Sequence, residues 1–538
     1  MHVPGQIPCG RPPSGRAMDG RPPRLGLLAL LPLLAHCAAA PRLDDVQAGH
    51  ALPPGDTTKL DRVIDAGLGD EPGMCAVRLI GQNSMAFGYR AATATSAERS
   101  LDIQYYIWNA DLTGKLMATE VLRAAERGVK VRVLVDDIDA RAKHDLFQVA
   151  DLHPNVEVRI FNPFYSRSGW FGQLTEWLIR GRRLNRRMHN KAWIVDNRIA
   201  IVGGRNLGDE YFGASDLSNF ADLDLVLAGP IVDQISASFD EYWNNPNAVP
   251  VDHFERKAPP PEALTQLLED AKEYRRTAGE SPYIAALRDV QKRADMLAAQ
   301  PPPLKVRETE VELLVDDPAK IGVELSEGES SRVMEGLERT MQQAKREVLI
   351  VSAYFVPGEA GTRRFAEMEE RGVRVVVNTN SLAATDVAAV HTGYMRYRKD
   401  LLRAGVEIFE TKRLADSEAG RRQISVTGSS GASLHTKAII VDDRWVYIGS
   451  MNIDPRANLN TEMGVLIDST VLAGQVRRQF ERSIVPELSY RVELEGNKLV
   501  WYDRIGDKDR RSTTEPDASF WRRIGVNMLR AVPIESQL

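Results

Sequence analysis

Apolar residues form six β-type segments along the chain, and these segments fall into three matched pairs. The pairs are 99–108 with 346–355, 128–137 with 372–380, and 155–161 with 405–410. In each copy of the repeat, a helix-like stretch that ends in a glycine separates the first β-type segment from the second. Strands that alternate with helices predict βαβ units. We therefore expect an α/β protein with two similar halves, each with a mostly parallel sheet flanked by helices.

The limits of this repeat and two proline runs divide the chain. Its 538 residues are too many for one ordinary core. The prolines at 259–261 and 301–303 flank a charged helical stretch, which is typical of a linker. The predicted segments are a leader (1–40), an N-terminal extension (41–75), half 1 (76–256), a Pro-bounded helical linker (257–303), half 2 (304–490) and a C-terminal extension (491–538).

The C-terminal extension contains one amphipathic segment. From Ser519 onwards, Trp521, Ile524 and Met528 recur at helical spacing and form one apolar face. We expect this helix to dock on the body through that face; a membrane-surface helix is the alternative.

A polar pattern is also duplicated, in "MHNKAWIVDNRIAIVGGRNLG" from Met188 and "LHTKAIIVDDRWVYIGSMNID" from Leu434. The first copy contains His189, Lys191, Asp196, Gly203, Gly204 and Asn206, and the second contains His435, Lys437, Asp442, Gly449, Ser450 and Asn452 at the same offsets. Two copies in step predict two half-sites that meet about a pseudo-twofold axis.

The residue types in this pattern suit phosphoryl chemistry. His and Lys are two apart, so on a strand both point to the same face. Lys and Asn can hold non-bridging phosphate oxygens, and His titrates near neutral pH. One neutral imidazole could attack phosphorus while the other donates a proton to the leaving alcohol. Because the two lysines supply positive charge, we expect neither a metal nor another cofactor.

Each histidine also needs an acceptor that fixes its tautomer. The segments "FADLDLVL" and "NTEMGVLI" align Asp222 with Glu462. We expect Asp222 to lie near His189, with Asp224 as its rival, and Glu462 to serve the second half. Asp196 and Asp442 end apolar strands, and together with the Gly and Ser positions they are predicted to be structural.

With these residues, the chain resembles the phospholipase D superfamily, whose signature is a duplicated H-x-K-x4-D followed by Gly-Gly/Ser-x-Asn. Outside the signature, residues 378–398, 452–464 and the "VPIESQL" terminus resemble the bacterial cardiolipin synthase C branch. The resemblance covers about 75–538 and implies a bilobal fold, a phosphatidyl-histidine intermediate and phosphatidyl transfer to phosphatidylglycerol. Within that superfamily, it points to His189 as the nucleophile and His435 as the proton donor.

Composition narrows the partners. The chain has 69 Lys and Arg against 74 Asp and Glu, a net charge of −5 that gives no chain-wide attraction for nucleic acid. Cys9, Cys37 and Cys75 are too few for a disulfide framework. Nucleic acid is therefore not expected as a partner. The family resemblance implies phospholipid partners, namely phosphatidylglycerol and a second lipid such as phosphatidylethanolamine, at a membrane surface.

Residues 169–187 lead directly into His189 and mix aromatic with basic side chains, as an anionic bilayer interface requires. Candidate membrane or pocket contacts are Trp170, Phe171, Trp177, Arg182 and Arg183 there, and His391 and Tyr394 further on. For residues 169–187 the alternatives are a basic patch that binds a polynucleotide and a solvated helix face. For His391 and Tyr394 the alternative is a packing role.

The apolar run 25–35 follows Arg21 and Arg24, as in an export signal. Cleavage after residues 38–40, lipidation of Cys37 and an uncleaved anchor stay open, as does a start at Met18 in place of Met1. We expect a bacterial envelope location. Three functions follow from the sequence: a phosphatidyltransferase that makes cardiolipin, a phospholipase D-type hydrolase of phospholipid or nucleic acid, and a non-catalytic membrane scaffold.

Overall fold

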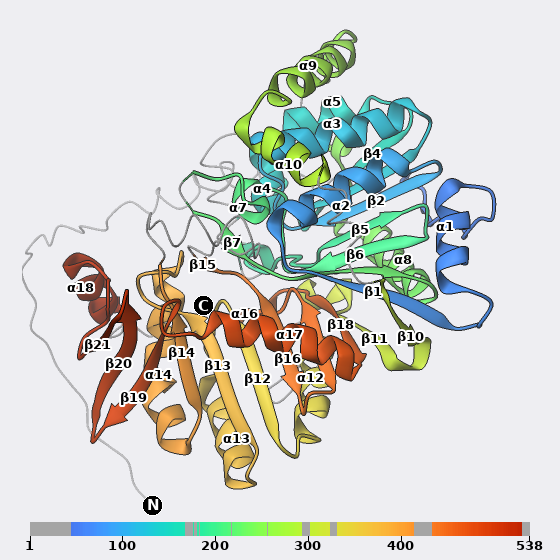
Figure 1. Cartoon of the computed structure of the whole chain (residues 1–538). Helices are drawn as coiled ribbons and strands as arrows, with labels where there is room; N and C mark the ends of the chain where they lie inside the picture. The colour runs from blue at the N-terminus through green and yellow to red at the C-terminus, as the bar shows by residue number, and fades with distance from the viewer. Residues whose placement is uncertain are drawn as a thin grey trace, which may run out of the picture.

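Two large mixed sheets dominate the protein (Figure 1). The computed structural model describes residues 43, 45–166, 176, 180–181, 183–216, 218–254, 257–292, 302–322, 331–413 and 433–529. Within these ranges, no helix combines the length and apolar character needed to cross a bilayer.

The first sheet holds nine strands of the described chain. Their spatial order is β10 (Leu304–Arg307), β1 (Met74–Ile80), β8 (Asp224–Ala228), β6 (Ile199–Gly203), β5 (Ala192–Val195), β2 (Ser100–Tyr105), β3 (Lys130–Asp136), β4 (Val156–Phe161) and β9 (Ala248–Pro250). Helices α2 (Asn83–Ser96), α3 (Leu112–Glu126) and α5 (His144–Asp151) contribute to the apolar core on one face.

The second sheet repeats this order and extends it. It runs β11 (Val311–Val315), β18 (Met463–Asp468), β17 (Trp445–Gly449), β16 (Lys437–Val441), β12 (Glu347–Ser352), β13 (Arg374–Asn380), β14 (Glu407–Thr411), β19 (Ser489–Glu495), β20 (Lys498–Ile505) and β21 (Lys508–Ser512). Helices α12 (Arg332–Gln342), α13 (Gly358–Glu370) and α14 (Ala388–Ala404) contribute to its outer core. The three predicted strand pairs are thus confirmed as β2 and β12, β3 and β13, and β4 and β14.

The expectation of mostly parallel sheets is wrong. Among the strand pairs of the two sheets in the described chain, only β2–β3, β3–β4, β12–β13 and β13–β14 are parallel. These are the pairs joined by helical crossovers. The remaining pairs are antiparallel, and among them each duplicated motif folds as a tight hairpin, β5–β6 and β16–β17.

The last residue of each H-x-K-x4-D pattern makes this hairpin. Asp196 and Asn197 both have φ 52°, and Asp442 and Asp443 have φ 54° and 57°. Two consecutive positive φ values define the two-residue turn that fits a twisted hairpin. The Asp442 carboxylate also accepts backbone N–H groups of Lys345, Arg346 and Glu347 at 2.8–3.0 Å. Asp196 does the same for residues 98–100.

We expect Asp442→Ala to lower the free energy of unfolding by about 2–4 kcal/mol. The change strands three backbone donors and puts Cβ-bearing Ala in a left-handed turn without a polar side chain. Urea unfolding measures the loss. As a control, Asp468→Ala removes a surface ion pair with Arg444 and should cost less than about 1 kcal/mol. Equal effects of the two changes would contradict this role.

One apolar cluster joins the halves. Helices α8 (Ile231–Trp243) and α17 (Thr470–Ser483) contribute to it, together with strands of both sheets such as β6, β8, β16 and β18. The same cluster contains Trp243 from half 1 and Phe480 from half 2, each less than a tenth exposed. Because the core is continuous, the two halves hold each other in a fixed orientation.

Two segments differ from their predicted boundaries, and the linker is helical as predicted but packs on half 1. β10 lies in the sequence range assigned to half 2 but pairs with β1 of the first sheet. The strands β20 and β21 lie in the C-terminal extension, yet they continue the second sheet. The linker range forms α9 (Ala263–Ala278) and α10 (Pro282–Lys292), and residues of both pack on the outer core of half 1.

The helix predicted from Ser519 is present as α18 (Phe520–Leu529), but it docks by a different face. Ala518 and Val526 are buried against Leu382, whereas Trp521 and Met528 are exposed. The correction has a simple cause: the sequence showed which residues share a helical face, but not which face the neighbouring α14 covers.

Candidate active site

Each motif begins with a strand segment that crosses to the other half. The backbone N–H of His189 donates to the carbonyl of Thr461 at 2.9 Å, and the N–H of His435 donates to the carbonyl of Ala221 at 2.9 Å. A small third sheet supports the second contact, with β15 (Ser433–Leu434) parallel to β7 (Phe220–Ala221). The two contacts are equivalent under the internal repeat, so both histidines sit where the halves meet.

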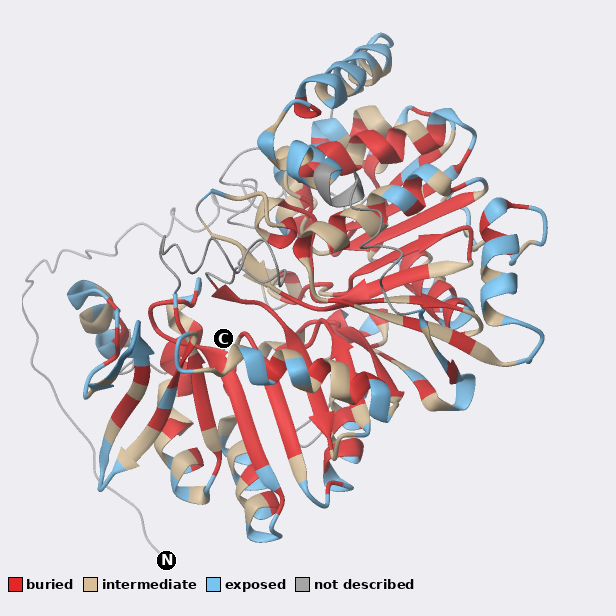
Figure 2. Cartoon of the chain, viewed as in Figure 1, coloured by how far each residue is buried: buried red, intermediate tan, exposed pale blue. Residues whose placement is uncertain are grey.

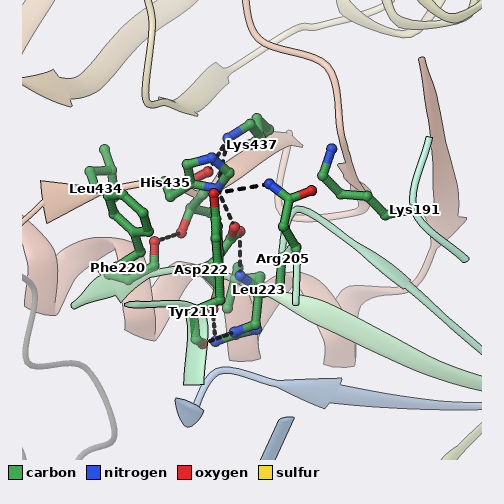
Figure 3. A network of polar contacts seen from close by, with 12 residues as sticks. Lys191, Arg205, Tyr211, Phe220, Asp222, Leu223, Leu434, His435 and Lys437 are labelled. Atoms are coloured by element: carbon green, nitrogen blue, oxygen red, sulfur yellow. Dashed lines mark hydrogen bonds and ion pairs between the residues drawn. The ribbon is translucent and has the colours of Figure 1, made fainter. Parts of the chain in front are cut away.

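Thr461 and Ala221 immediately precede the two candidate carboxylates, and this fixes the pairing. His189 Nδ1 lies 2.8 Å from Glu462 Oε2. His435 Nδ1 lies 2.6 Å from Asp222 Oδ2, the pair at the centre of Figure 3. The expected partners are therefore exchanged: each histidine takes its carboxylate from the opposite half. Asp224, the predicted rival, instead binds Arg90 at 2.9 Å and Arg205 at 3.2 Å.

The lysines connect the two half-sites electrostatically. Lys191 Nζ donates to the carbonyl of His189 at 2.6 Å, and Lys437 donates to the carbonyl of His435. Burial, then the charge of Lys437, lowers the pKa of His435 well below its usual value, and Lys191 lowers it further. Figure 3 shows both lysines around the His435–Asp222 pair. The two motif lysines and the two histidines thus share one electrostatic environment.

The pKa values of the two carboxylates shift in opposite directions. Burial raises the pKa of Asp222, only partly offset by Lys437 and Arg205. Burial would raise that of Glu462 too, but His189, Lys191 and the Ser450 hydroxyl hold its pKa below the usual value. Burial likewise lowers the pKa of His189, opposed by Glu462. His189 therefore faces a carboxylate that stays ionised.

The motif asparagines brace the adjoining loops. Asn206 accepts the N–H of Ile107 at 3.3 Å and donates to the Tyr211 hydroxyl at 2.9 Å. Asn452 accepts the N–H of Tyr354 at 3.4 Å. Both asparagines are buried. These contacts are all to groups of the protein, and both asparagines lie on the loops that follow β6 and β17.

Sequence reasoning missed the aromatic walls of the site. The ring of Tyr106 lies 5.1 Å from that of His189, and the rings of Tyr211 and Phe220 lie 5.2 and 5.1 Å from that of His435. The repeat carries no signal for Tyr211, because residues 207–211 already differ from the aligned residues 453–457 at every position. Tyr211 packs against the histidine of the other half, which only the fold reveals.

The position after the first motif glycine is matched to the carboxylate that faces it. Ser450 donates to Glu462. At the equivalent Gly204, an added Cβ would lie 2.4 and 2.6 Å from the Asp222 carboxylate oxygens. Because the Asp222 side chain leaves its carboxylate against position 204, only Gly fits there. The longer Glu462 side chain leaves room for Ser at position 450. Gly203 and Gly449 are similarly crowded by the backbone of β8 and β18.

Gly204→Ala should lower turnover by about 10- to 100-fold, because the new methyl group pushes the Asp222 carboxylate away from His435. Turnover per folded protein is the measurement. Gly474→Ala is the control, since its added Cβ would lie at ordinary contact distance, 3.5 Å from Arg478. Unchanged turnover in Gly204→Ala would show that the Asp222 position is not critical.

The remaining candidates lie away from these side chains. His391 and Tyr394 are buried in a cluster with Arg398: Tyr394 donates to Glu410 at 2.9 Å, and His391 lies 3.8 Å from Glu515. They have the packing role, which rules out membrane contact. Arg183 donates to Asn162 at 3.1 Å. Trp170, Phe171, Trp177 and Arg182 lie outside the described residues. Over the described ranges, no group of three His, Cys, Asp or Glu residues is arranged to hold a metal.

Comparison with known proteins agrees with this architecture. Residues 91–243 and 337–484 match the family model described as "Cardiolipin synthase, PLD-like domain". The chain is 38% identical to cardiolipin synthase C of Escherichia coli over 478 residues, 86% of this chain and 96% of that protein. It is 26% identical over 408 residues to cardiolipin synthase B of the same organism, 76% of this chain and 80% of that protein.

A solved structure supports the fold alone. Phosphatidylserine synthase from Haemophilus influenzae matches with a TM-score of 0.55 and 13% identity, over 89% of this chain and all of that one. The family and the bilobal phospholipase D-like fold expected from the duplicated motif are thereby confirmed. The chain belongs to the cardiolipin synthase family of phospholipase D-like proteins.

Proposed function

We propose that the chain is a phosphatidyltransferase that makes cardiolipin from phosphatidylglycerol and a second phospholipid. The observation that carries the proposal is the exchange between halves, which brings two His–Lys pairs and two carboxylates to one site. Family membership supports the same reaction class. No cofactor takes part, because Lys191 and Lys437 supply the positive charge at the phosphate.

The first step forms a phosphatidyl-histidine. Nε2 of His189 attacks the phosphorus of the donor lipid, and the bond from phosphorus to the head-group oxygen breaks. His435 gives that oxygen a proton. Nδ1 of each ring is held by its carboxylate, which leaves Nε2 for this chemistry.

The second step reverses these roles on a new alcohol. A hydroxyl of phosphatidylglycerol attacks phosphorus, its proton goes to His435, and the phosphorus–nitrogen bond to His189 breaks. Cardiolipin leaves when the acceptor is that lipid, and phosphatidic acid leaves when it is water. Burial, the largest influence, lowers the pKa of Lys191 to about 7, and the bound phosphate anion favours its charged form.

The assignment of His189 as nucleophile has a structural argument. Attack by Nε2 places positive charge on the imidazole ring, and the ionised Glu462 stabilises that charge. Burial and the two lysines oppose a proton on His435, so its protonated form is a strong acid that gives the proton up readily. Bound phosphate provides the negative charge that allows this proton to be held beforehand.

The test uses the full chain with vesicles of phosphatidylglycerol, with and without phosphatidylethanolamine, and lipid products resolved by mass. New cardiolipin supports the transferase, and predominant phosphatidic acid supports the hydrolase of phospholipid. We expect EDTA to change neither the rate nor the products. Absence of any lipid product, together with cleavage of a polynucleotide, would overturn the proposal in favour of a nuclease.

Placement in the bacterial cell envelope is part of the same proposal. The leader and the lipidation site at Cys37 lie outside the described residues, so they stay predictions. Mass measurement of the protein purified from membranes separates cleavage after residues 38–40 from acylation of Cys37.

A further inference from the structure

The helix α18 presents an apolar face to solvent. Among the described residues, the three most exposed large apolar side chains all lie on it: Trp521 is 77% exposed, Met528 70% and Phe520 63% (Figure 2). Trp521 and Met528 are seven residues apart, so they share one helical face. The Phe520 and Trp521 rings pack edge to face at 5.4 Å and extend that face.

The opposite side of α18 is fixed to the protein. Val526 and Ala518 pack on Leu382, with Ala388 and Met395 of α14 beside them. Arg522 donates to the carbonyl of Thr385, and Arg523 donates to the Thr514 hydroxyl at 3.1 Å. These contacts fix the orientation of α18, so its apolar face points to solvent because of the fold and not because the helix is loosely attached.

A short chain of contacts leads from α18 to the active site. Arg522 binds Thr385, and the next residue, Asp386, accepts a hydrogen bond from the Tyr354 hydroxyl at 2.8 Å. The backbone N–H of Tyr354 donates to the motif residue Asn452. Val387, the neighbour of Asp386, is also an exposed apolar side chain. In Figure 1, α18 lies at the outer edge of the second half, beside β20 and β21.

We propose that α18, with Val387 beside it, docks on a phospholipid bilayer and holds the active site at the lipid surface. The inference rests on the proposed function, because a bilayer lipid can reach the histidines only if the site opens at the membrane. Tryptophan and phenylalanine are side chains favoured where acyl chains meet head groups.

Two features favour a bilayer over a protein partner. Four apolar side chains, none of them fully exposed, cover less than the roughly 800 Å² per partner that a stable protein interface buries. The two arginines of α18 already bind groups of the protein, so the free surface is apolar. Docking should therefore depend only weakly on salt, unlike attraction through surface charges.

Co-sedimentation with phosphatidylglycerol-containing vesicles tests the surface directly and needs no catalysis. Trp521→Glu and Met528→Glu should each lower the partition coefficient by about 10- to 100-fold, with circular dichroism unchanged. Val471→Glu is the matched control: Val471 is an exposed valine on α17, and its replacement should leave binding intact. Brominated acyl chains should quench tryptophan fluorescence in the native chain, and Trp521→Phe should remove most of that quenching.

Turnover separates this inference from the proposed function. For Trp521→Glu, the loss on vesicles should exceed the loss on short-chain, monomeric phosphatidylglycerol by about tenfold or more. Vesicle binding of both Glu variants equal to the native chain would overturn the docking role. So would a dimer, measured by light scattering, that dissociates in Trp521→Glu, since it would assign the face to a second copy. If the native chain binds vesicles through α18 but gives no lipid product, the proposed reaction fails and the docking surface stands.

Discussion

Replacing either motif histidine by alanine should lower turnover by at least about ten-thousandfold. The reason is that the two rings act in sequence on one phosphorus: without His189 no covalent intermediate forms, and without His435 the leaving oxygen receives no proton. Neither ring is needed for the hydrophobic core, so circular dichroism and the unfolding midpoint should stay close to those of the native chain. Initial rates of cardiolipin formation are the measurement.

Replacing Lys191 or Lys437 by alanine should also lower turnover strongly. Each lysine lowers the pKa of the histidine of the other half as well as that of its own. His50→Ala is the control, since the His50 side chain is 72% exposed and far along the chain from either motif. Near-normal turnover in Lys437→Ala, with an undisturbed fold, would contradict a single site built from both halves.

The two histidine variants should also differ from each other. A lipid with a good leaving group needs no proton donor, so His435→Ala should still form the phosphatidyl adduct, and peptide mass should locate it on His189. His189→Ala should form none. An adduct on His435 in the His189→Ala protein, and none in the reverse variant, would exchange the two roles.

Much of this architecture could be predicted because the repeat is local. The strands, the order of the elements and the matched His, Lys, Asp and Asn positions are all properties of short segments. The turn geometry at Asp196 and Asp442 follows from the same segments, since polar residues at the end of an apolar strand favour a tight hairpin. The antiparallel direction of the other strands could not be predicted, because the sequence of a strand is similar whether it pairs through a hairpin or through a crossover.

The exchange of carboxylates could not be predicted by alignment. Aligning the halves shows that Asp222 and Glu462 are equivalent, but it does not say whether each serves its own half. The choice depends on how the halves pack, through Thr461 and Ala221 as backbone acceptors for the opposite motif. In an internally repeated protein, both arrangements keep the symmetry: each carboxylate can contact the histidine of its own half or that of the other half. The packing of the interface determines which contact forms.

Changing Glu462 to glutamine should lower kcat by about a thousandfold, because the positive charge that forms on His189 during attack loses its ionised partner. The Gln side chain keeps the size of Glu, and its amide oxygen can still accept from Nδ1. The pH dependence should shift in a defined direction. Glu462 holds the pKa of His189 up against burial, so its removal lowers that pKa further. A neutral nucleophile then persists to lower pH, and the acidic limb of kcat/KM moves to lower pH.

The same measurement tests the role of His189 independently of the rate. If His189 were the proton donor, its protonated form would be the active one, and the alkaline limb would move to lower pH while the acidic limb stayed in place. Asp224→Asn is the matched control: it removes a buried carboxylate that pairs with Arg90 and Arg205 and touches neither histidine. It should lower stability without moving the acidic limb. An acidic limb unmoved in Glu462→Gln would show that the carboxylate from the other half does not tune the attacking ring, and that the crossing of Glu462 to His189 serves only to join the halves.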